Sequence, residues 1–229
     1  ISEIPNFTSD LINDSKFVTS SDLLAENVGY DSTTVKDTLD SLLYEAINIT
    51  SFTSNVEPVQ EIGTNINSIT LTWKLSQPAT EQFINDVPVT GSSFTFDTPF
   101  NSNKSFTLKV NDGTTIKSKT IDIKFMNNIY YGVSSSTTYD SNFIESLTKE
   151  LRQATEMNFR VNAGKDEYIC FAYPSHYGEA VFSVGGFEGG FREVAKFYYT
   201  NESGYNEQYI VYCSDNPCLG DTRVKVIYV

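Results

Sequence analysis

The sequence predicts a mainly β protein in four parts: an extended N-terminal segment, a short coiled-coil helix, a β-sandwich and a C-terminal β-rich domain with one helix. Three observations support this class. Apolar and polar residues alternate with period two in residues 50–126, and seven further strand-like runs follow residue 126. Apolar residues take heptad spacing once, in residues 33–49. Composition also changes near residues 50 and 126, which predicts boundaries there.

Charge and aromatic content define these zones. The chain has 229 residues and a net charge of −13. Residues 1–50 carry nine acidic and two basic residues, residues 51–126 seven and six, and residues 127–229 thirteen and eight. Twelve of the fourteen tyrosines and nine of the thirteen glycines lie beyond residue 126. The acidic balance argues against nucleic acid as a partner, and no apolar run approaches the ~20 residues that a membrane-spanning helix needs.

Residues 1–32 are expected to form an extended attachment segment. Their apolar residues, such as Ile4, Phe7 and Phe17, are too scattered to build a core. Ordering the backbone costs roughly 1–2 kcal/mol per residue, which such a segment cannot offset alone. We therefore expect it to lie on another protein or on copies of itself.

Residues 33–49 are predicted to form a helix that Ser32 or Thr33 caps. An apolar seam steps by 4, 3, 4 and 3 residues, as in a coiled coil, through Val35, Leu39, Leu42, Ala46 and Ile49. The alternative is an amphipathic helix packed on its own domain. The preceding segment offers no folded surface for that packing, so self-association through the seam is favoured.

Residues 50–126 are predicted to form a small sandwich. Ile69, Leu71, Trp73 and Leu75 point to one side of a strand while the residues between them point to the other. Residues 111–113, Asn-Asp-Gly, supply a hairpin turn. Short strands around one tryptophan over about 75 residues are typical of an immunoglobulin-like sandwich, here without a cysteine.

Residues 127–229 are predicted to form a second β-rich unit with one helix. Asp140 or Ser141 caps this helix, and Phe143, Ile144, Leu147 and Leu151 would share one of its faces. The expected strands are 129–134, 157–162, 167–173, 179–185, 192–199, 207–213 and 222–229. Most of them end at Gly, Asn or Asp, as turns require.

Two segments of this unit are candidates for binding. Residues 185–191, Gly-Gly-Phe-Glu-Gly-Gly-Phe, form either a structural turn anchored by Phe187 and Phe191 or a ligand loop. Residues 173–178 are expected to form a loop in which Tyr173, His176 and Tyr177 can contact sugars, because each ring has an apolar body and a polar edge. The alternative for both segments is a purely structural role.

The chain offers little for catalysis or metal binding. His176 is the single histidine, and the three cysteines, Cys170, Cys213 and Cys218, do not follow a zinc-site pattern. Cys213 and Cys218 can close a small disulfide, but three cysteines without a pattern favour reduced thiols. We therefore predict no enzyme activity, no catalytic residue, no metal and no cofactor.

The order of these elements resembles proteins of tailed bacteriophages. Residues 4–19 are similar to a segment of tail-fibre and baseplate proteins, through Thr8-Ser9, Leu11, Asn13-Asp14-Ser15 and Phe17, although Lys16 stands where glycine is common. Residues 26–43 look like a second such element, in which a turn enters a short trimeric helix. Residues 127–229 look like C-terminal domains of uncharacterised phage tail proteins, through residues 172–174, 185–187 and 201–205.

This resemblance implies a homotrimeric virion protein of the tail, made in the host cytoplasm. Residues 1–32 would dock on other tail or baseplate proteins, and the distal tip would bind a host-surface glycan. The candidate receptor-binding residues are Tyr173, His176, Tyr177, Phe187, Phe191 and Tyr205. The alternative is a structural adaptor or decoration protein that binds other virion proteins. A depolymerase tailspike is less favoured, because the chain shows no β-helix repeat.

Overall fold

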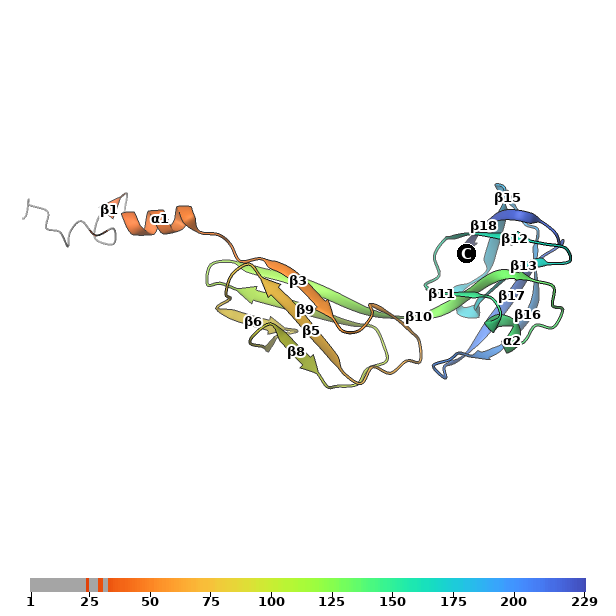
Figure 1. The fold of residues 1–229 in the computed structure, drawn as a ribbon, viewed down its shortest axis with the longest axis horizontal. Coiled ribbons are helices and arrows are strands. Elements are labelled where there is room, and N and C mark those ends of the chain that lie inside the picture. Colours follow the sequence, from red (N-terminus) through yellow and green to blue (C-terminus); the bar gives the residue numbers. More distant parts are fainter. Residues whose placement is uncertain (1–23, 25–28, 31–32) are drawn as a thin grey trace, which may run out of the picture. The chain divides into compact units, whose positions relative to one another are not determined.

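The computed structural model describes residues 24, 29–30 and 33–229, and it is mainly β, as the sequence predicted (Figure 1). Apart from residues 24 and 29–30, the predicted attachment segment lies outside the described residues. The chain forms two compact units that meet between Ala46 and Ile47. Each unit is described by itself.

The described part of the first unit contains one helix, α1, which spans Val35–Leu43. Two short strands, β1 (Gly29–Tyr30) and β2 (Thr33–Thr34), pair just before it. The helix is capped by Thr34, not by Ser32 or Thr33: the Thr34 hydroxyl accepts from the Asp37 amide at 3.1 Å, and the Asp37 carboxylate accepts from the Thr34 amide at 3.2 Å. The hydrogen bonds from Thr34 lower the pKa of Asp37.

The helix is shorter than predicted, so the predicted seam is wrong at its C-terminal end. Ala46 lies beyond the helix. Ile49 belongs to a strand, and the Ile49 side chain is buried. The physical reason is competition from the sandwich core, which buries both Ile47 and Ile49. The Ile47 amide also donates to Asp112 Oδ2 at 3.0 Å, which fixes extended backbone where the heptad pattern alone would continue the helix.

Residues 47–126 form a two-layer sandwich, consistent with the immunoglobulin-like fold predicted for them. One sheet has the order β3-β5-β8 and the other the order β10-β9-β6-β7, with β4 parallel to β10. These strands are β3 (Ile49–Ser54), β4 (Val59–Glu61), β5 (Ile69–Leu75), β6 (Glu81–Ile84), β7 (Val87–Pro88), β8 (Ser93–Phe96), β9 (Lys104–Asn111) and β10 (Ile116–Ser134). Trp73 is buried between the sheets, and its indole N–H donates to Gln82 Oε1 at 2.6 Å.

β10 runs through both halves of the second compact unit, residues 47–229. Its first residues pair with β9, and its last residues, from Asn127 onward, pair with β11 and β13 (Figure 1). We call residues 127–229 the distal domain. The continuous strand joins the sandwich to the distal domain without a linker.

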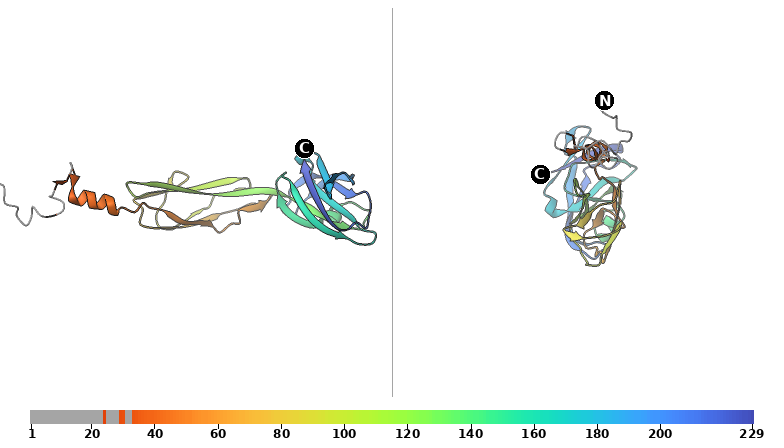
Figure 2. Two further views of the ribbon diagram at one scale, coloured as in Figure 1. Left: turned by 90° about the horizontal axis from the view of Figure 1, so that it is seen from above. Right: turned by 90° about the vertical axis from the view of Figure 1, so that its left-hand side faces the viewer.

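The distal domain is a second sandwich, whose strands can be followed from above in the left view of Figure 2. One sheet has the order β16-β17-β13-β10 with β11 also on β10, and the other has the order β12-β18-β14-β15. Its strands are β11 (Thr148–Arg152), β12 (Met157–Ala163), β13 (Tyr168–Pro174), β14 (Ala180–Val184), β15 (Phe187–Glu188), β16 (Phe191–Thr200), β17 (Asn206–Ser214) and β18 (Gly220–Tyr228). The bounds of β12, β13, β14, β16, β17 and β18 match predicted strands to within two residues, and β10 begins earlier than expected. The strands β11 and β15 were not predicted.

The sheet formed by β16, β17, β13 and β10 is buried on both faces. Ile169, Phe171 and Tyr173 of β13 enter the core between the sheets, while Cys170 and Ala172 enter a second core on the outer face. Because both faces are covered, the strand reads as a continuous apolar run and not as an alternation. The second core is closed by α2, which spans Ser141–Glu145.

The predicted helix after Asp140 is therefore shorter than expected. Asp140 does cap it, since Asp140 Oδ1 accepts from the Phe143 amide at 2.9 Å. Leu147 lies in the turn that follows, and Leu151 lies in β11 opposite Asn128 of β10. Backbone pairing with the free edge of β10 outweighs the helical spacing of Leu151.

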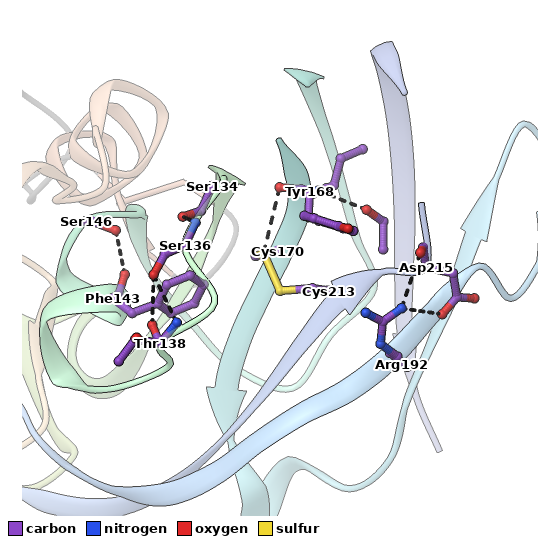
Figure 3. The surroundings of a disulfide bond; sticks show 12 residues. Ser134, Ser136, Thr138, Phe143, Ser146, Tyr168, Cys170, Arg192, Cys213 and Asp215 are labelled. Atoms are coloured by element: carbon purple, nitrogen blue, oxygen red, sulfur yellow. Dashed lines mark hydrogen bonds and ion pairs between the residues drawn. A yellow bond between two sulfur atoms is a disulfide. The ribbon is translucent and has the colours of Figure 1, made fainter. Parts of the chain in front are cut away.

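Cys170 and Cys213 form a disulfide, so the prediction of reduced thiols and the alternative Cys213–Cys218 pair are both wrong (Figure 3). The two cysteines face each other across β13 and β17, with a Cα–Cα distance of 4.2 Å. They are separated by 43 positions in sequence, and only strand pairing brings them together. Cys218 is a free, exposed thiol whose sulfur accepts from the Asp166 amide at 3.1 Å.

Candidate functional site

Three of the six predicted binding residues, His176, Tyr177 and Tyr205, line one groove of about 400 Å³. The groove lies where β10 passes from the sandwich to the distal domain. We call it the junction groove. Its lining comprises Ile62, Phe125, Met126, Asn127, Gln153, Ala154, His176, Tyr177, Tyr205 and Glu207.

His176 and Tyr177 are placed by a tight turn between β13 and β14. A short 3₁₀ turn, η2 (Ser175–Tyr177), follows Pro174 and ends at Gly178, whose φ is 95°. A Cβ at Gly178 would lie 2.6 Å from the Val229 carbonyl oxygen, so glycine is required there for both reasons. The turn therefore returns the chain immediately to the sheet and presents both rings to the groove.

His176 is held by Glu207. Its Nδ1 bonds Glu207 Oε1, and the His176 side chain remains 55% exposed while that of Glu207 is 15% exposed. Since a carboxylate only accepts, the neutral imidazole carries its proton on Nδ1 and leaves Nε2 as an acceptor. Glu207 Oε2 is buried and has no hydrogen-bond partner within the described residues.

Tyr177 forms a wall of the groove. Its hydroxyl donates to the Arg152 carbonyl at 2.6 Å, and its ring meets the His176 ring edge to face at 4.7 Å. Burial raises the pKa of Tyr177. The hydroxyl is thus committed to the protein, and Tyr177 contributes mainly ring surface to the groove.

Tyr205 is the most exposed tyrosine in the groove, at 39%. It ends a small hairpin loop in which Asn201 Oδ1 accepts from the Tyr205 amide at 2.8 Å and the Tyr205 carbonyl accepts from the Asn201 amide at 2.9 Å. A Cβ at Gly63 would lie 2.7 Å from Tyr205 Cβ. This close approach fixes the backbone of Tyr205 and leaves its ring partly free.

The wall behind Tyr205 is held by a polar network centred on Glu61. Glu61 accepts from the Asn128 side chain through Oε1 and from the Ser203 hydroxyl at 3.0 Å through Oε2. Asn201 Nδ2 donates to the Ile62 carbonyl at 2.8 Å. These bonds hold the sandwich residues and the Tyr205 loop in one arrangement, which a preformed binding site requires.

Three predicted binding residues do not line this groove. Tyr173 is fully buried, so its prediction as a surface contact is wrong; its hydroxyl donates to the Gly178 carbonyl and accepts from the Ala180 amide, each at 3.1 Å. Phe191 is half-buried and stacks on Phe182 with centroids 4.4 Å apart. Residues 173–177 are therefore not a distal tip, because the turn lies beside the start of the distal domain.

Phe187 lies elsewhere, at 82% exposure, on the β14–β15 hairpin. It lines a smaller hollow of about 230 Å³ with Leu219, which is 40% exposed. The glycines on both sides of it, at 185–186 and 189–190, all have positive φ. The glycine-rich motif is thus a turn that only glycine forms readily, as its structural interpretation predicted, but Phe187 is too exposed to anchor it as that interpretation expected.

Sequence reasoning missed Asn127, Gln153 and Glu207. Each lies in or beside a strand and carries no motif, so only the pairing of the strands reveals its place in the groove. The groove combines aromatic surface with amides, one imidazole and one carboxylate. Among the described residues that line it, Glu207 is the single carboxylate, so the paired acids of a glycoside hydrolase are not assembled there.

No group of three or more potential metal ligands occurs within the described residues. Across residues 24, 29–30 and 33–229, no helix has the length and apolar character to span a membrane.

Comparison with known proteins adds little. No protein-family model matches the chain, and no curated protein matches it. One solved structure, a tandem pair of titin immunoglobulin domains, aligns with 81% of this chain and 97% of its own at 5% identity and a TM-score of 0.20. A likeness at that level carries no argument about fold or function.

Proposed function

We propose that this protein is a tail appendage of a bacteriophage virion that binds a host-surface glycan in the junction groove. The observation that carries the glycan-binding part is the gathering of His176, Tyr177 and Tyr205 around one hollow with a carboxylate and two amides. The viral part rests on the sequence resemblance of residues 4–19, 26–43 and 127–229.

The groove has the chemistry that sugars need. A pyranose has apolar C–H faces, which pack on aromatic rings, and a rim of hydroxyls, which pair with amide, imidazole and carboxylate groups. Tyr205 offers an exposed ring, while Asn127, Gln153 and His176 offer polar groups around it. Few convergent polar groups in a mostly preformed hollow are typical of small-ligand sites.

Weak sugar contacts become useful when several copies bind together. None of the described residues of α1 is buried, and Leu39, Leu42 and Leu43 are 47%, 76% and 76% exposed. A free helix of 9 residues is unstable in water, so partners for this apolar face would stabilise it. We propose that α1 forms a trimer through Val35, Leu39 and Leu42, which would raise avidity by ~10²-fold or more.

In this proposal the sandwich of residues 47–126 is an immunoglobulin-like spacer. Residues 1–32 would attach the trimer to other tail or baseplate proteins. The polar network around Glu61 would then keep the junction groove in a fixed geometry beside the spacer.

A panel of immobilised bacterial surface polysaccharides and oligosaccharides tests glycan binding. We expect the full chain to bind at least one glycan, and Tyr205→Ala to weaken that binding by about tenfold or more, since an aromatic contact is lost. Tyr198→Ala is the matched control, because Tyr198 is a 68% exposed tyrosine on β16 outside the groove. Equal binding by both variants and the wild type would contradict the proposal.

The alternative function is a structural adaptor that binds other virion proteins. The exposed Phe187 and Leu219 beside the smaller hollow favour it, because exposed apolar clusters often mark protein contacts. An adaptor would bind no glycan on the panel, and Phe187→Ala would impair its incorporation into particles while Tyr205→Ala would not.

A further inference from the structure

We infer that the junction groove takes a neutral, hydroxyl-rich sugar and discriminates against sugars that carry a carboxylate. This inference rests on the proposed function and adds the chemical class of the ligand. It follows from three features of the described residues: the free edge of His176, the incompletely paired charge of Glu207, and the commitment of nearby cations to other partners.

The first feature is the edge of His176 that is free to meet a ligand. Because Nδ1 is bonded to Glu207, Nε2 is the ring nitrogen left for a bound group. In the neutral ring Nε2 accepts a hydrogen bond, so it suits a hydroxyl group. On that neutral ring a carboxylate, which has no proton to donate, meets a lone pair, whereas a hydroxyl group can pair with Nε2 in either protonation state because it both donates and accepts.

The second feature is the charge of Glu207. Oε1 is paired with His176, but Oε2 is covered by protein and has no hydrogen-bond partner in the part of the chain that the structure describes. A carboxylate with few donors in a partly desolvated place keeps a strong negative field. That field repels an anion in the groove and leaves a neutral sugar unaffected.

The third feature is that no lysine or arginine is present among the described lining residues. Arg152, which precedes the lining residue Gln153, donates through Nη1 to Glu150 Oε1 at 2.7 Å and through Nη2 to the Glu156 carbonyl at 2.8 Å, while its Nε is buried without a hydrogen-bond partner in the described part of the chain. Lys149 is paired with Glu202 at 2.8 Å. Each of these two cations is thus ion-paired with a carboxylate, Arg152 with Glu150 and Lys149 with Glu202, and the distal domain as a whole is acidic.

The test compares matched glycan pairs on an array with the full-length chain. Each pair has the same core, with a neutral hexose in one member and a uronic acid or sialic acid at the same position in the other. We expect wild-type signal on neutral members, and binding weaker by about tenfold or more on acidic members. Glu207→Gln keeps the size of the side chain and removes the charge, so we expect it to reduce this discrimination by about threefold or more.

Glu193→Gln is the control for charge, because Glu193 is an exposed acid on β16 outside the groove. It should leave the ratio of neutral to acidic binding unchanged. His176→Asn retains a side-chain donor for Glu207 but has no Nε2, so neutral binding should fall by about fivefold or more. Near-ultraviolet circular dichroism establishes that each variant keeps the native fold.

The outcomes separate the inference from the proposed function. Preference for acidic glycans, abolished by Tyr205→Ala, would overturn the inference and leave glycan binding in the groove intact. An unchanged ratio in folded Glu207→Gln would also overturn it, because the field of Glu207 would not set the specificity. Binding of neither class would overturn the inference and the proposed function together.

Discussion

The sandwich and the distal domain have similar two-layer folds, but different side chains stabilise them. The sandwich core is built from isoleucine, leucine, valine, phenylalanine and Trp73, and residues 47–126 contain neither tyrosine nor cysteine. The distal domain buries Tyr130, Tyr173, Tyr199 and Tyr209 and adds the Cys170–Cys213 disulfide.

The reason for the difference is the number of buried faces. One distal sheet has a core on each face, so some large side chains must end near buried polar backbone. Tyrosine fits such positions, because its ring fills space while its hydroxyl finds a partner. Tyr209 donates to the Asn128 carbonyl at 2.7 Å, and Tyr130 donates to the Tyr199 hydroxyl at 3.2 Å.

A domain that is rich in tyrosine therefore does not necessarily expose those tyrosines on its surface. The sequence predicted Tyr173, Tyr177 and Tyr205 as binding residues, but Tyr173 is one of several tyrosines that are buried in the distal cores. The groove uses Tyr177 and Tyr205, and Tyr198 is exposed on an edge strand. Structural and binding tyrosines can be separated by experiment.

The largest expected difference between the two regions is at alkaline pH. Burial raises the pKa of Tyr130, Tyr173 and Tyr209, whereas an unfolded chain ionises its tyrosines near pH 10. Above pH 10 the unfolded state therefore binds fewer protons, and each buried phenol lowers the free energy of unfolding by up to about 1.4 kcal/mol per pH unit. We expect the distal domain to unfold before the sandwich as the pH rises above 10.

Two spectroscopic signals follow the two regions separately. Absorbance at 295 nm reports ionised tyrosine, and the emission maximum of Trp73, the single tryptophan, reports the sandwich. The expected result is a cooperative rise in tyrosinate absorbance at a pH where Trp73 emission is still native. Simultaneous loss of both, or titration of all tyrosines near pH 10 without unfolding, would contradict the assignment of these cores.

The next effect comes from the disulfide. Cys170 and Cys213 close a loop of 43 positions, so replacing both with alanine should lower the free energy of unfolding of the distal domain by about 4 kcal/mol. The sandwich has no cysteine and should keep its stability. Thiol titration of the denatured, unreduced chain should find one thiol, from Cys218; three thiols would show that the bridge does not form.

Tyr173→Phe should have a smaller effect, of about 2 kcal/mol, because it leaves the buried Gly178 carbonyl and Ala180 amide without partners. Glycan binding by the folded variant should be unchanged. Tyr205→Ala should have the converse effect: its free energy of unfolding should change by less than about 0.5 kcal/mol, while its glycan binding should weaken by about tenfold or more. Denaturant unfolding and array binding of both variants measure these effects. Weaker glycan binding by Tyr173→Phe at unchanged stability would contradict the account, because it would place Tyr173 in contact with the ligand.

The smallest expected effect on the stability of residues 47–229 is that of Leu39→Asp in α1. A charge in the proposed seam should convert a trimer to a monomer while both sandwiches keep their stability. Light-scattering mass measures the oligomeric state, and thermal unfolding measures the stability of the two sandwiches. A wild-type monomer would remove the seam, and Lys36→Ala serves as a control outside it.

The sequence predicted elements whose signals are local. Period-two alternation located the sandwich, and turn residues located the strands of the distal domain. It failed where long-range pairing outweighs a local pattern, as at Ile49, which the sandwich core buries, and at Leu151, which pairs in β11. The heptad and helical spacings there were real, but tertiary contacts stabilise extended backbone more.

The candidate site was only partly predictable for the same reason. His176, Tyr177 and Tyr205 stood out as aromatic residues in loops, yet Glu207 lies 31 positions from His176 and reaches it through strand pairing. Tyr173 shares the motif with His176, but Tyr173 lies on the face of β13 that enters the core between the sheets, whereas His176 lies in the η2 turn after the strand. Burial on both faces of a sheet cannot be read from residue type alone.

His176 makes one measurement of glycan binding especially clear, because it is the single histidine in the chain. A full-length protein with isotope-labelled histidine gives one ring spin system, which can be followed while a neutral glycan that binds on the array is added. If the junction groove is the binding site, the His176 ring signals should shift and saturate with the same Kd as binding. Ring signals that stay unchanged at saturating glycan would place the ligand elsewhere and contradict the proposed site.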